Sequence, residues 1–406
     1  MYEDRIFYPQ TTRSPGFLDL NPQYGAWNMT DFGDGIIIGI IDSGIWPESS
    51  SFNDHGLGPV RSSWRGKCVD ADDFNASLCN NKLVGAKAFS SSADAMAAIK
   101  SSRIPSPRDK LGHGTHVAST AAGAEVPDAG LYTFSQGTAR GMAPKARIAM
   151  YKVCDDTGCW GADIAAAVET AVKDGVDIIS MSLGGLRDSP FYDDVIAVST
   201  FGAERKGIFV AMAGENFGPA KSSVGNVAPW MTTVGAATID RLFPANLTLG
   251  NGVVLEGQSL YVMQANSTGM IQLMYSYCSI ESANWTHERV KGKIMVCMDE
   301  GGDTDVYSFL LHKAGGAGIV VVEDSELFGD STPASPSTIP GLTIGFDSGE
   351  RLRAYMASVS NPVASFSFIS KTIIQENEAP IVAGFSSRGP NPVVPSSSSP
   401  TLSHLE

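Results

Sequence analysis

Short apolar runs alternate with alanine-rich stretches of helical period between Gly35 and Thr238. Buried strands are predicted at 35–42, 146–154, 176–185, 208–214 and 231–238. Helices are predicted at 113–124, 161–175 and 193–207. This alternation is typical of a parallel sheet with right-handed crossovers, so the pattern predicts an α/β fold with a doubly wound sheet.

The pattern changes after about Thr238, where the sequence becomes rich in turns and β-leaning up to about Ser370. Short apolar strand and turn segments resume in "APIVAGFSSRGP" at 379–390. We therefore expect a second domain inserted into the first. The last stretch, "NPVVPSSSSPTLSHLE", is rich in Pro and Ser and is predicted to be disordered.

The negative net charge of this chain of 406 residues disfavours two classes of binding partner. A formal net charge of -14 disfavours nucleic acid, because binding to phosphate relies on cationic groups. It disfavours anionic membranes for the same reason. No long apolar segment could cross a bilayer, and "MYEDRIFYPQTTRSP" lacks the apolar core of a secretory signal. Taken alone, these features would predict a cytosolic protein.

Cysteines and glycosylation sequons point instead to secretion. The six cysteines lie in pairs of short separation that suit three local disulfides and match no common metal pattern, although fifteen pairings are open. They are Cys68, Cys79, Cys154, Cys159, Cys278 and Cys297. Asn-x-Ser/Thr sequons occur at Asn28, Asn75, Asn246, Asn266 and Asn284. We expect a secreted glycoprotein whose leader is missing from this sequence.

Two chemically active side chains follow predicted element boundaries. Asp42 comes at the end of an apolar strand, where a carboxylate is costly unless it meets a partner. His113 opens a predicted helix between glycines and is the obvious partner. An acid that orients an imidazole is two thirds of a hydrolytic triad, in the chain order Asp then His. "SLGG" at 182–185 and "AGEN" at 213–216 also follow strands, so they should line the same edge of the sheet.

His116 is spaced to share a helix face with His113, which makes a zinc pair conceivable. No Glu lies between the two histidines, and there is no clear third ligand. We therefore predict that His116 is a packed structural residue and that the chain binds no metal and no cofactor. His55, His287, His312 and His404 lie in polar or loop-like stretches and are predicted to be surface residues.

Four motifs together resemble the plant subtilases, a group of subtilisin-like serine proteases: "IIDSGIWPES", "GHGTHVAST", "ISMSLGG" and "FSSRGPNP". The resemblance runs from "TTRSPGFLDL" to about Pro395. It implies that Asp42 is the orienting acid and His113 the general base. It also implies that the backbone of Ser182, Leu183, Gly184 and Gly185 pairs with an extended peptide substrate.

The resemblance also implies a domain plan: a subtilisin-like doubly wound parallel α/β sheet, incomplete, with an inserted, mainly β protease-associated domain. Residues 1–10 would be the remnant of an inhibitory propeptide, and 11–250 the first part of the catalytic domain. Residues 251–370 would form the protease-associated insertion, and 371–395 the start of the second catalytic part. Residues 396–406 would be a divergent, disordered tail.

Two features depart from the family pattern. The family's oxyanion asparagine lies in an Ala-Gly-Asn turn, but here Glu215 intervenes and displaces Asn216 by one residue. Asn216 could be the oxyanion donor or only a turn residue before Gly218 and Pro219. The family's nucleophile lies in a Gly-Thr-Ser-Met turn beyond "SSRGPNP", and no Gly-Thr-Ser occurs in the 406 residues.

By family, we expect a serine endopeptidase that cleaves polypeptides through an acyl-enzyme and is inhibited by its own propeptide. Secretion to the plant cell wall is expected as well. The 406 residues as written lack the serine and are predicted to be inactive. The alternative is a non-catalytic pseudoprotease or fragment that binds peptides or partners.

Overall fold

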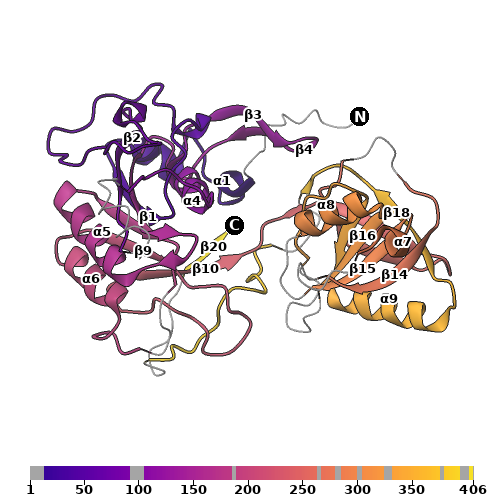
Figure 1. Cartoon of the computed structure of the whole chain (residues 1–406). Coiled ribbons are helices and arrows are strands. Elements are labelled where there is room, and N and C mark those ends of the chain that lie inside the picture. The colour runs from indigo at the N-terminus through magenta and orange to yellow at the C-terminus, as the bar shows by residue number, and fades with distance from the viewer. Residues whose placement is uncertain are drawn as a thin grey trace. The chain divides into compact units, whose positions relative to one another are not determined.

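The computed structural model describes residues 13–91, 105–184, 189–262, 267–278, 285–299, 304–323, 332–374, 379–393 and 402–405. The chain divides into two compact units (Figure 1). The first consists of residues 1–129, 137–238 and 385–406, and the second of 130–136 and 239–384.

A seven-stranded sheet forms the centre of the first unit, and all its strand pairs are parallel. In spatial order the strands are β2 (Leu83–Ala88), β5 (Arg147–Lys152), β1 (Ile37–Asp42), β8 (Ile178–Met181), β9 (Phe209–Ala213), β10 (Thr232–Ala237) and β20 (Leu402–Leu405). The five predicted strands and the doubly wound α/β class are confirmed. Sequence analysis missed β2, whose "LVGAKA" is short and interrupted by Gly85.

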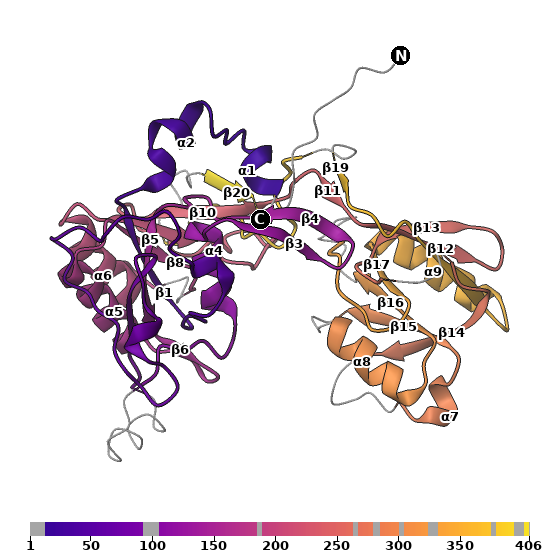
Figure 2. The ribbon, with the colours of Figure 1, turned by 90° about the horizontal axis from the view of Figure 1, so that it is seen from above.

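Helices cover both faces of this sheet, because successive residues of β1 point to opposite sides. Ile38 and Ile40 pack with α4 (His113–Ala122), whereas Ile37 and Ile41 pack with α5 (Gly161–Asp174) and α6 (Val195–Glu204). Figure 2 shows α4 and the α5–α6 pair on opposite sides of β1. This alternation places Asp42 on the face that carries α4.

Short elements complete the first unit. α5 ends at Gly175, whose φ of 91° is the left-handed geometry expected of its stop glycine. Asp194 caps α6 by accepting a hydrogen bond from the Ile196 amide at 2.8 Å. The other elements are α1 (Arg13–Phe17), α2 (Gly25–Met29), η1 (Asp31–Gly33), η2 (Ser50–Phe52), η3 (Ala76–Leu78) and the hairpin β6 (Cys154–Asp155) with β7 (Gly158–Cys159). The hairpin β3 (Val126–Leu131) with β4 (Phe134–Ala139) is divided, because its residues 130–136 belong to the second unit.

A closed seven-stranded barrel forms the second unit. Its order is β12 (Pro244–Leu249), β13 (Val254–Gln258), β17 (Gly341–Ile344), β16 (Gly318–Glu323), β15 (Ile294–Asp299), β14 (Ile271–Tyr277) and β18 (Val363–Phe368). Ile294 and Val296 of β15 belong to one buried cluster, whereas Met295 and Cys297 belong to another. The remaining elements are α7 (His287–Val290), α8 (Thr304–Ala314), α9 (Phe346–Ser358), β11 (Arg241–Leu242) and β19 (Ile373–Ile374).

The bounds of the second unit are wider than the predicted 251–370. Its first barrel strand is β12, because Leu247 and Leu249 alternate into the same buried cluster as Phe366 of β18. Phe134, from the short segment 130–136, packs edge-to-face on Phe243 with ring centroids 5.6 Å apart. The identity of this unit as a protease-associated domain stays a prediction.

The last residues differ from their predicted disorder. Leu402–Leu405 form β20, which runs parallel to β10 with Leu402 opposite Val234. The prediction was wrong here because the edge of β10 offers unpaired backbone groups that a short extended segment can satisfy. Residues 396–401 and Glu406 lie outside the described part of the chain.

All six cysteines form local disulfides, so one of the fifteen open pairings is now selected. The pairs are Cys68–Cys79, Cys154–Cys159 and Cys278–Cys297. No helix in the described ranges is both long and apolar enough to span a bilayer.

Candidate active site

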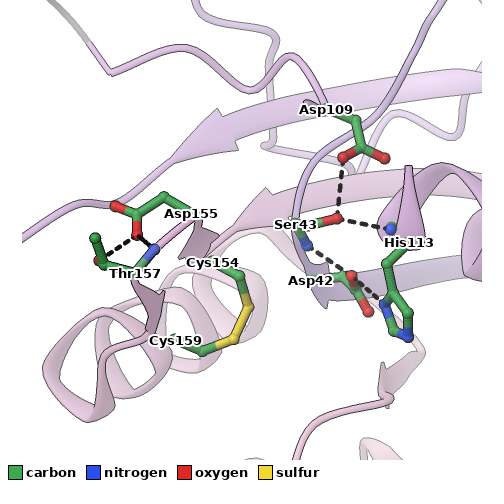
Figure 3. Close-up of a disulfide and its surroundings, with 9 residues drawn as sticks. Asp42, Ser43, Asp109, His113, Cys154, Asp155, Thr157 and Cys159 are labelled. Atoms are coloured by element: carbon green, nitrogen blue, oxygen red, sulfur yellow. Dashed lines mark hydrogen bonds and ion pairs between the residues drawn. A yellow bond between two sulfur atoms is a disulfide. The ribbon is translucent and has the colours of Figure 1, made fainter. Parts of the chain in front are cut away.

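Asp42 and His113 meet at the carboxyl edge of the sheet (Figure 3). Asp42 Oδ1 lies 2.7 Å from His113 Nδ1, which joins the end of β1 to the first residue of α4. The Asp42 side chain is 1% exposed, whereas the His113 side chain is 54% exposed. An acid that holds Nδ1 fixes the tautomer of the ring and leaves Nε2 to exchange protons with a reacting group.

Two glycines make this contact possible. Gly44 follows β1 with a φ of 119°, and a side chain there would collide with the backbone at Pro107. A side chain at Gly114 would collide with the carbonyl oxygen of Gly44. The first turn of α4 therefore packs directly against the turn after β1, as the paired sequences "DSG" and "HG" require.

Asp109 supports the first turn of α4, and sequence analysis missed it. Burial raises the pKa of the Asp109 carboxyl, but hydrogen bonds outweigh that effect and hold the pKa below its usual value. The donors are the Leu111, Gly112 and Thr115 amides and the Thr115 and Ser43 hydroxyls. Asp109 lies four residues before α4, whose N-cap is Gly112, so no capping pattern in the sequence indicated this role.

The same network connects Asp109 to the acid of the pair. Ser43 Oγ donates to Asp109 Oδ1 at 3.0 Å and accepts from the Gly114 amide at 2.8 Å (Figure 3). The Ser43 amide in turn donates to Asp42 Oδ1 at 2.6 Å. Asp42 and His113 are therefore held from both sides by buried polar contacts.

The segment after β8 and the end of β9 are joined by a side chain that sequence analysis also missed. Asn226 Nδ2 donates to the Leu183 carbonyl at 2.7 Å and to the Ala213 carbonyl at 2.8 Å. β1, β8 and β9 are parallel neighbours, so Ser182–Gly184 lie at the same edge as Asp42. Gly185 lies outside the described residues.

Glu215, not Asn216, takes the inward position after Gly214. Glu215 is 8% exposed, with a φ of 72°, whereas Asn216 is exposed. A Cβ added to Gly184 would lie 2.6 Å from Glu215 Oε1, and a Cβ added to Gly225 would lie closer still. The carboxyl group therefore fills the space between these two glycines. The oxyanion role of Asn216 stays a prediction.

The loop that carries Glu215 is fastened by the segment that returns from the second unit. The Ser387 amide donates to the Glu215 carbonyl at 3.1 Å, and Ser387 Oγ accepts from the Phe217 amide at 3.0 Å. The Gly218 amide donates to the Phe385 carbonyl at 2.8 Å. Residues 385–389 thus hold the loop at 213–218 through backbone and hydroxyl groups.

Comparison with known proteins decides the family. The sequence profile described as the Subtilase family matches residues 33–403, which is most of the chain. The chain belongs to the subtilase family. Within it, the chain is 44% identical to subtilisin-like protease SBT1.6 of Arabidopsis thaliana, over 99% of this chain and 54% of that protein.

Two other plant subtilases give the same result. SBT1.4 of Arabidopsis thaliana is 43% identical over 95% of this chain, and SBT3 of Solanum lycopersicum is 37% identical over 96%. Each alignment covers 51% of the relative, so this subtilase chain spans about half the length of the curated relatives that it matches. The solved structure of sphericase covers 56% of this chain and 58% of its own, at 24% identity with a TM-score of 0.35.

The remaining predicted sites of this subtilase have mixed outcomes. His116 is exposed on α4, so its prediction as a packed residue is wrong. His55, His287 and His312 are exposed, and His404 has no described side chain. Within the described residues, no group of three His, Cys, Asp or Glu could hold a metal ion.

The sequons differ in their accessibility. Asn28 and Asn75 are exposed, and Asn246 is half-buried in β12, whereas Asn266 and Asn284 lie outside the described residues. Asn28 and Asn75 are therefore the sequons that the described geometry makes most accessible to a glycosyltransferase.

Proposed function

We propose that the protein carrying this chain is a secreted serine endopeptidase. The observation that carries the proposal is the 2.7 Å contact between the buried Asp42 carboxylate and the half-exposed His113 ring. In that arrangement the ring can act as a general base on one side while its other nitrogen is held. The subtilisin-like proteases to which the chain is similar support the same reaction class.

The reaction needs a serine nucleophile. His113 Nε2 takes the proton of the serine hydroxyl as its oxygen attacks the peptide carbonyl, and Asp42 stabilises the imidazolium that forms. The imidazolium then returns the proton to the leaving amine, and water hydrolyses the acyl-enzyme by the reverse sequence. In the family this serine lies in a Gly-Thr-Ser-Met turn, which the 406 residues do not contain. These residues alone are therefore expected not to hydrolyse peptides.

The substrate is an extended polypeptide that pairs with the backbone of Ser182–Gly184 and, by the family resemblance, of Gly185. An added strand supplies affinity through main-chain hydrogen bonds while its side chains enter separate pockets. The propeptide is the first such ligand that we expect. Three disulfides and the exposed sequons at Asn28 and Asn75 support an extracellular site of action, which we assign to the plant cell wall.

The test uses the longest secreted product of the gene that contains this chain. It is expected to cleave fluorogenic peptides and to react with a fluorophosphonate probe. His113→Ala should abolish both activities, and Asp42→Asn should lower kcat by about 10⁴-fold, because the imidazole loses its orienting acid. Full peptidase activity in both variants would refute the assignment of the pair.

One observation favours a second candidate, a non-catalytic peptide-binding protein. Glu215 brings a carboxylate to the turn where the family has an amide donor, and a negative charge there opposes an oxyanion. In that case the gene product would bind unstructured peptides without cleaving them. Measuring peptide binding and cleavage on the same preparation separates the two candidates.

A further inference from the structure

We infer that Asn226 is a positioning residue for the peptide substrate. Its side-chain amide fixes the segment 182–184 and so presents the backbone of that segment to the peptide. This inference rests on the proposed function, because it explains how the proposed peptide-binding segment is held in place. It also gives a role to a buried side chain that lies outside the Asp42–His113 pair.

The first support is the place of Asn226 in the sheet. The parallel ladder between β8 and β9 ends at the Met181–Met212 pair. Just beyond it, Asn226 Nδ2 donates to the Leu183 carbonyl at 2.7 Å and to the Ala213 carbonyl at 2.8 Å. One carboxamide therefore joins the two strand ends where backbone pairing between them stops.

The second support is the chemistry of this bridge. Both acceptors are carbonyl oxygens, so the side chain between them must donate two hydrogen bonds, and the NH₂ group of a carboxamide does so. An aspartate of the same shape has no donor at neutral pH, and it would place a negative charge beside two carbonyl dipoles. The position therefore requires an amide and not merely a side chain of this size.

The third support is that Asn226 is held before any peptide binds. It is 7% exposed, and its φ of 55° lies in the left-handed region, which asparagine adopts more readily than most residues. The Thr233 hydroxyl, itself buried, donates to the Asn226 backbone carbonyl at 2.5 Å. An anchor with a fixed backbone and a fixed side chain reduces the ordering cost that peptide binding would otherwise carry.

The bridge also decides which backbone groups face the peptide. Successive carbonyls in an extended segment point to opposite sides. Because Asn226 holds the Leu183 carbonyl toward Ala213, the backbone groups of Ser182 and Gly184 are directed to the other side. Without the amide, the segment loses the contact that orients it, while the acid–histidine pair keeps its own contacts. The affinity for an extended peptide should therefore fall, and the reaction of a short substrate should not change.

Substrate length gives the first test, in the longest secreted product of the gene. Thiobenzyl esters of one residue and of four residues share the residue before the scissile bond, and only the longer ester can pair along the segment 182–184. Asn226→Gly removes the amide and tolerates the left-handed backbone. The ratio of kcat/KM for the long ester to that for the short ester should fall about tenfold or more, mainly through a higher KM for the long ester. Rates are expressed per serine that reacts with a fluorophosphonate probe.

Two further variants make this result specific. Asn226→Asp keeps the shape of the side chain but not its donors, so it should lower the ratio as Asn226→Gly does. Asn251→Gly is the matched control, at an exposed asparagine in the turn between β12 and β13, and should leave the ratio unchanged. An unchanged ratio in both Asn226 variants, or an equal loss for the two esters, would overturn the inference, because Asn226 would then only stabilise the fold.

A binding measurement keeps the inference testable if the gene product cleaves nothing. Fluorescein-labelled β-casein, an unfolded polypeptide, is titrated into the product carrying His113→Ala, alone or with Asn226→Gly or Asn251→Gly. A dissociation constant that rises about tenfold or more with Asn226→Gly alone supports the inference, in which case only the proposed peptidase activity fails. Casein binding that is absent from the parent protein, or that ignores Asn226→Gly, would count against it decisively.

Discussion

At the scale of single residues, the Asp42–His113 pair depends on a third buried group. Asp109 accepts five hydrogen bonds around the start of α4, and one of them comes from Ser43, which also binds the Gly114 amide. The proposed general base, His113, is therefore positioned by a carboxylate that does not touch it. The two carboxylates have separate tasks, since Asp42 orients the ring and Asp109 orients the helix.

Replacing Asp109 by Asn should destabilise the first unit by about 2 kcal/mol at pH 7. The asparagine NH₂ group would face amides and hydroxyls that all donate hydrogen bonds, so it would leave some of them without an acceptor. The folded-state pKa of Asp109 is below its usual value, so its stabilisation is present above about pH 4 and is lost as pH falls through the folded pKa. The difference between wild type and Asp109→Asn should therefore shrink below pH 4. Urea unfolding at pH 7, 5, 4 and 3 tests this, and equal stability at pH 7 would contradict it.

Lys82 gives a second pH dependence, of the same sign as that of Asp109 but at higher pH, because its folded-state pKa is also lowered. It is fully buried at the start of β2 and donates to the Pro144 and Ala146 carbonyls at 2.7 and 2.6 Å. Burial, with a contribution from nearby Arg147, lowers the pKa of Lys82 to about 7. Below pH 7 Lys82 is charged in the native state, so the native state bears the whole desolvation penalty of a buried ammonium group. Between pH 7 and about 10 the unfolded chain binds the proton better, so native stability rises with pH.

We predict that the free energy of unfolding of wild type rises relative to Lys82→Met between pH 7 and 10. The slope should approach about 1.4 kcal/mol per pH unit. Lys173→Met removes an exposed lysine from α5 and should show no such slope. A flat difference for Lys82→Met in urea titrations would mean that Lys82 titrates normally in the folded protein.

Sequence patterns predicted that Asp42 and His113 would meet, because both residues lie at element boundaries and have a glycine within two positions. They did not identify Asp109 or Asn226, because the roles of these residues come from partners up to 66 positions away in the chain. The inward orientation of the Glu215 side chain could not be predicted from the sequence either. It depends on a left-handed backbone that no pattern of apolar residues encodes.

At the scale of elements, the central strands of the parallel sheet were the easiest to predict. β1 and β5 are buried along nearly their whole length, as parallel central strands are, whereas β8, β9 and β10 alternate between buried and partly exposed positions. β12 lies in the second compact unit, whereas the predicted boundary at residue 250 put it in the first part, because the half-buried alternation of "PANLTL" is compatible with either domain.

The loop after β9 carries the clearest prediction at this scale. Deleting Glu215 brings Asn216 directly after Gly214 and restores the family's Ala-Gly-Asn turn. In the gene's longest product, kcat should rise about a hundredfold for all peptides, the value of one oxyanion donor. Adding Asn216→Ala to the deletion should remove the gain. A deletion variant that folds but is no faster would show that Asn216 does not serve the oxyanion.

At the scale of the whole molecule, the second unit has the features of an independently folding domain. Its barrel is closed, so it leaves no unpaired sheet edge, and it has its own buried clusters. It also includes residues 130–136, whose Phe134 is buried against Phe243.

We predict that residues 239–384 alone unfold in one cooperative calorimetric transition, at a lower temperature than the same unit in the whole chain. The loss reflects the missing Phe134, and Phe134→Ala in the whole chain should destabilise this unit by about 3 kcal/mol. A fragment without a cooperative transition would show that the barrel needs the rest of the chain.

The discontinuity of the first unit sets an order of events during synthesis. The loop that bears Glu215 leaves the ribosome before residues 239–384, but residues 385–389, which fasten it, leave afterwards. At 5–20 residues per second, this interval lasts about 10–30 s. The nascent chain therefore spends that time with the Glu215 loop unfastened, although Asp42 and His113 have already been made. Synthesis of the barrel thus delays the completion of the proposed peptidase site while the chain emerges among other newly made proteins.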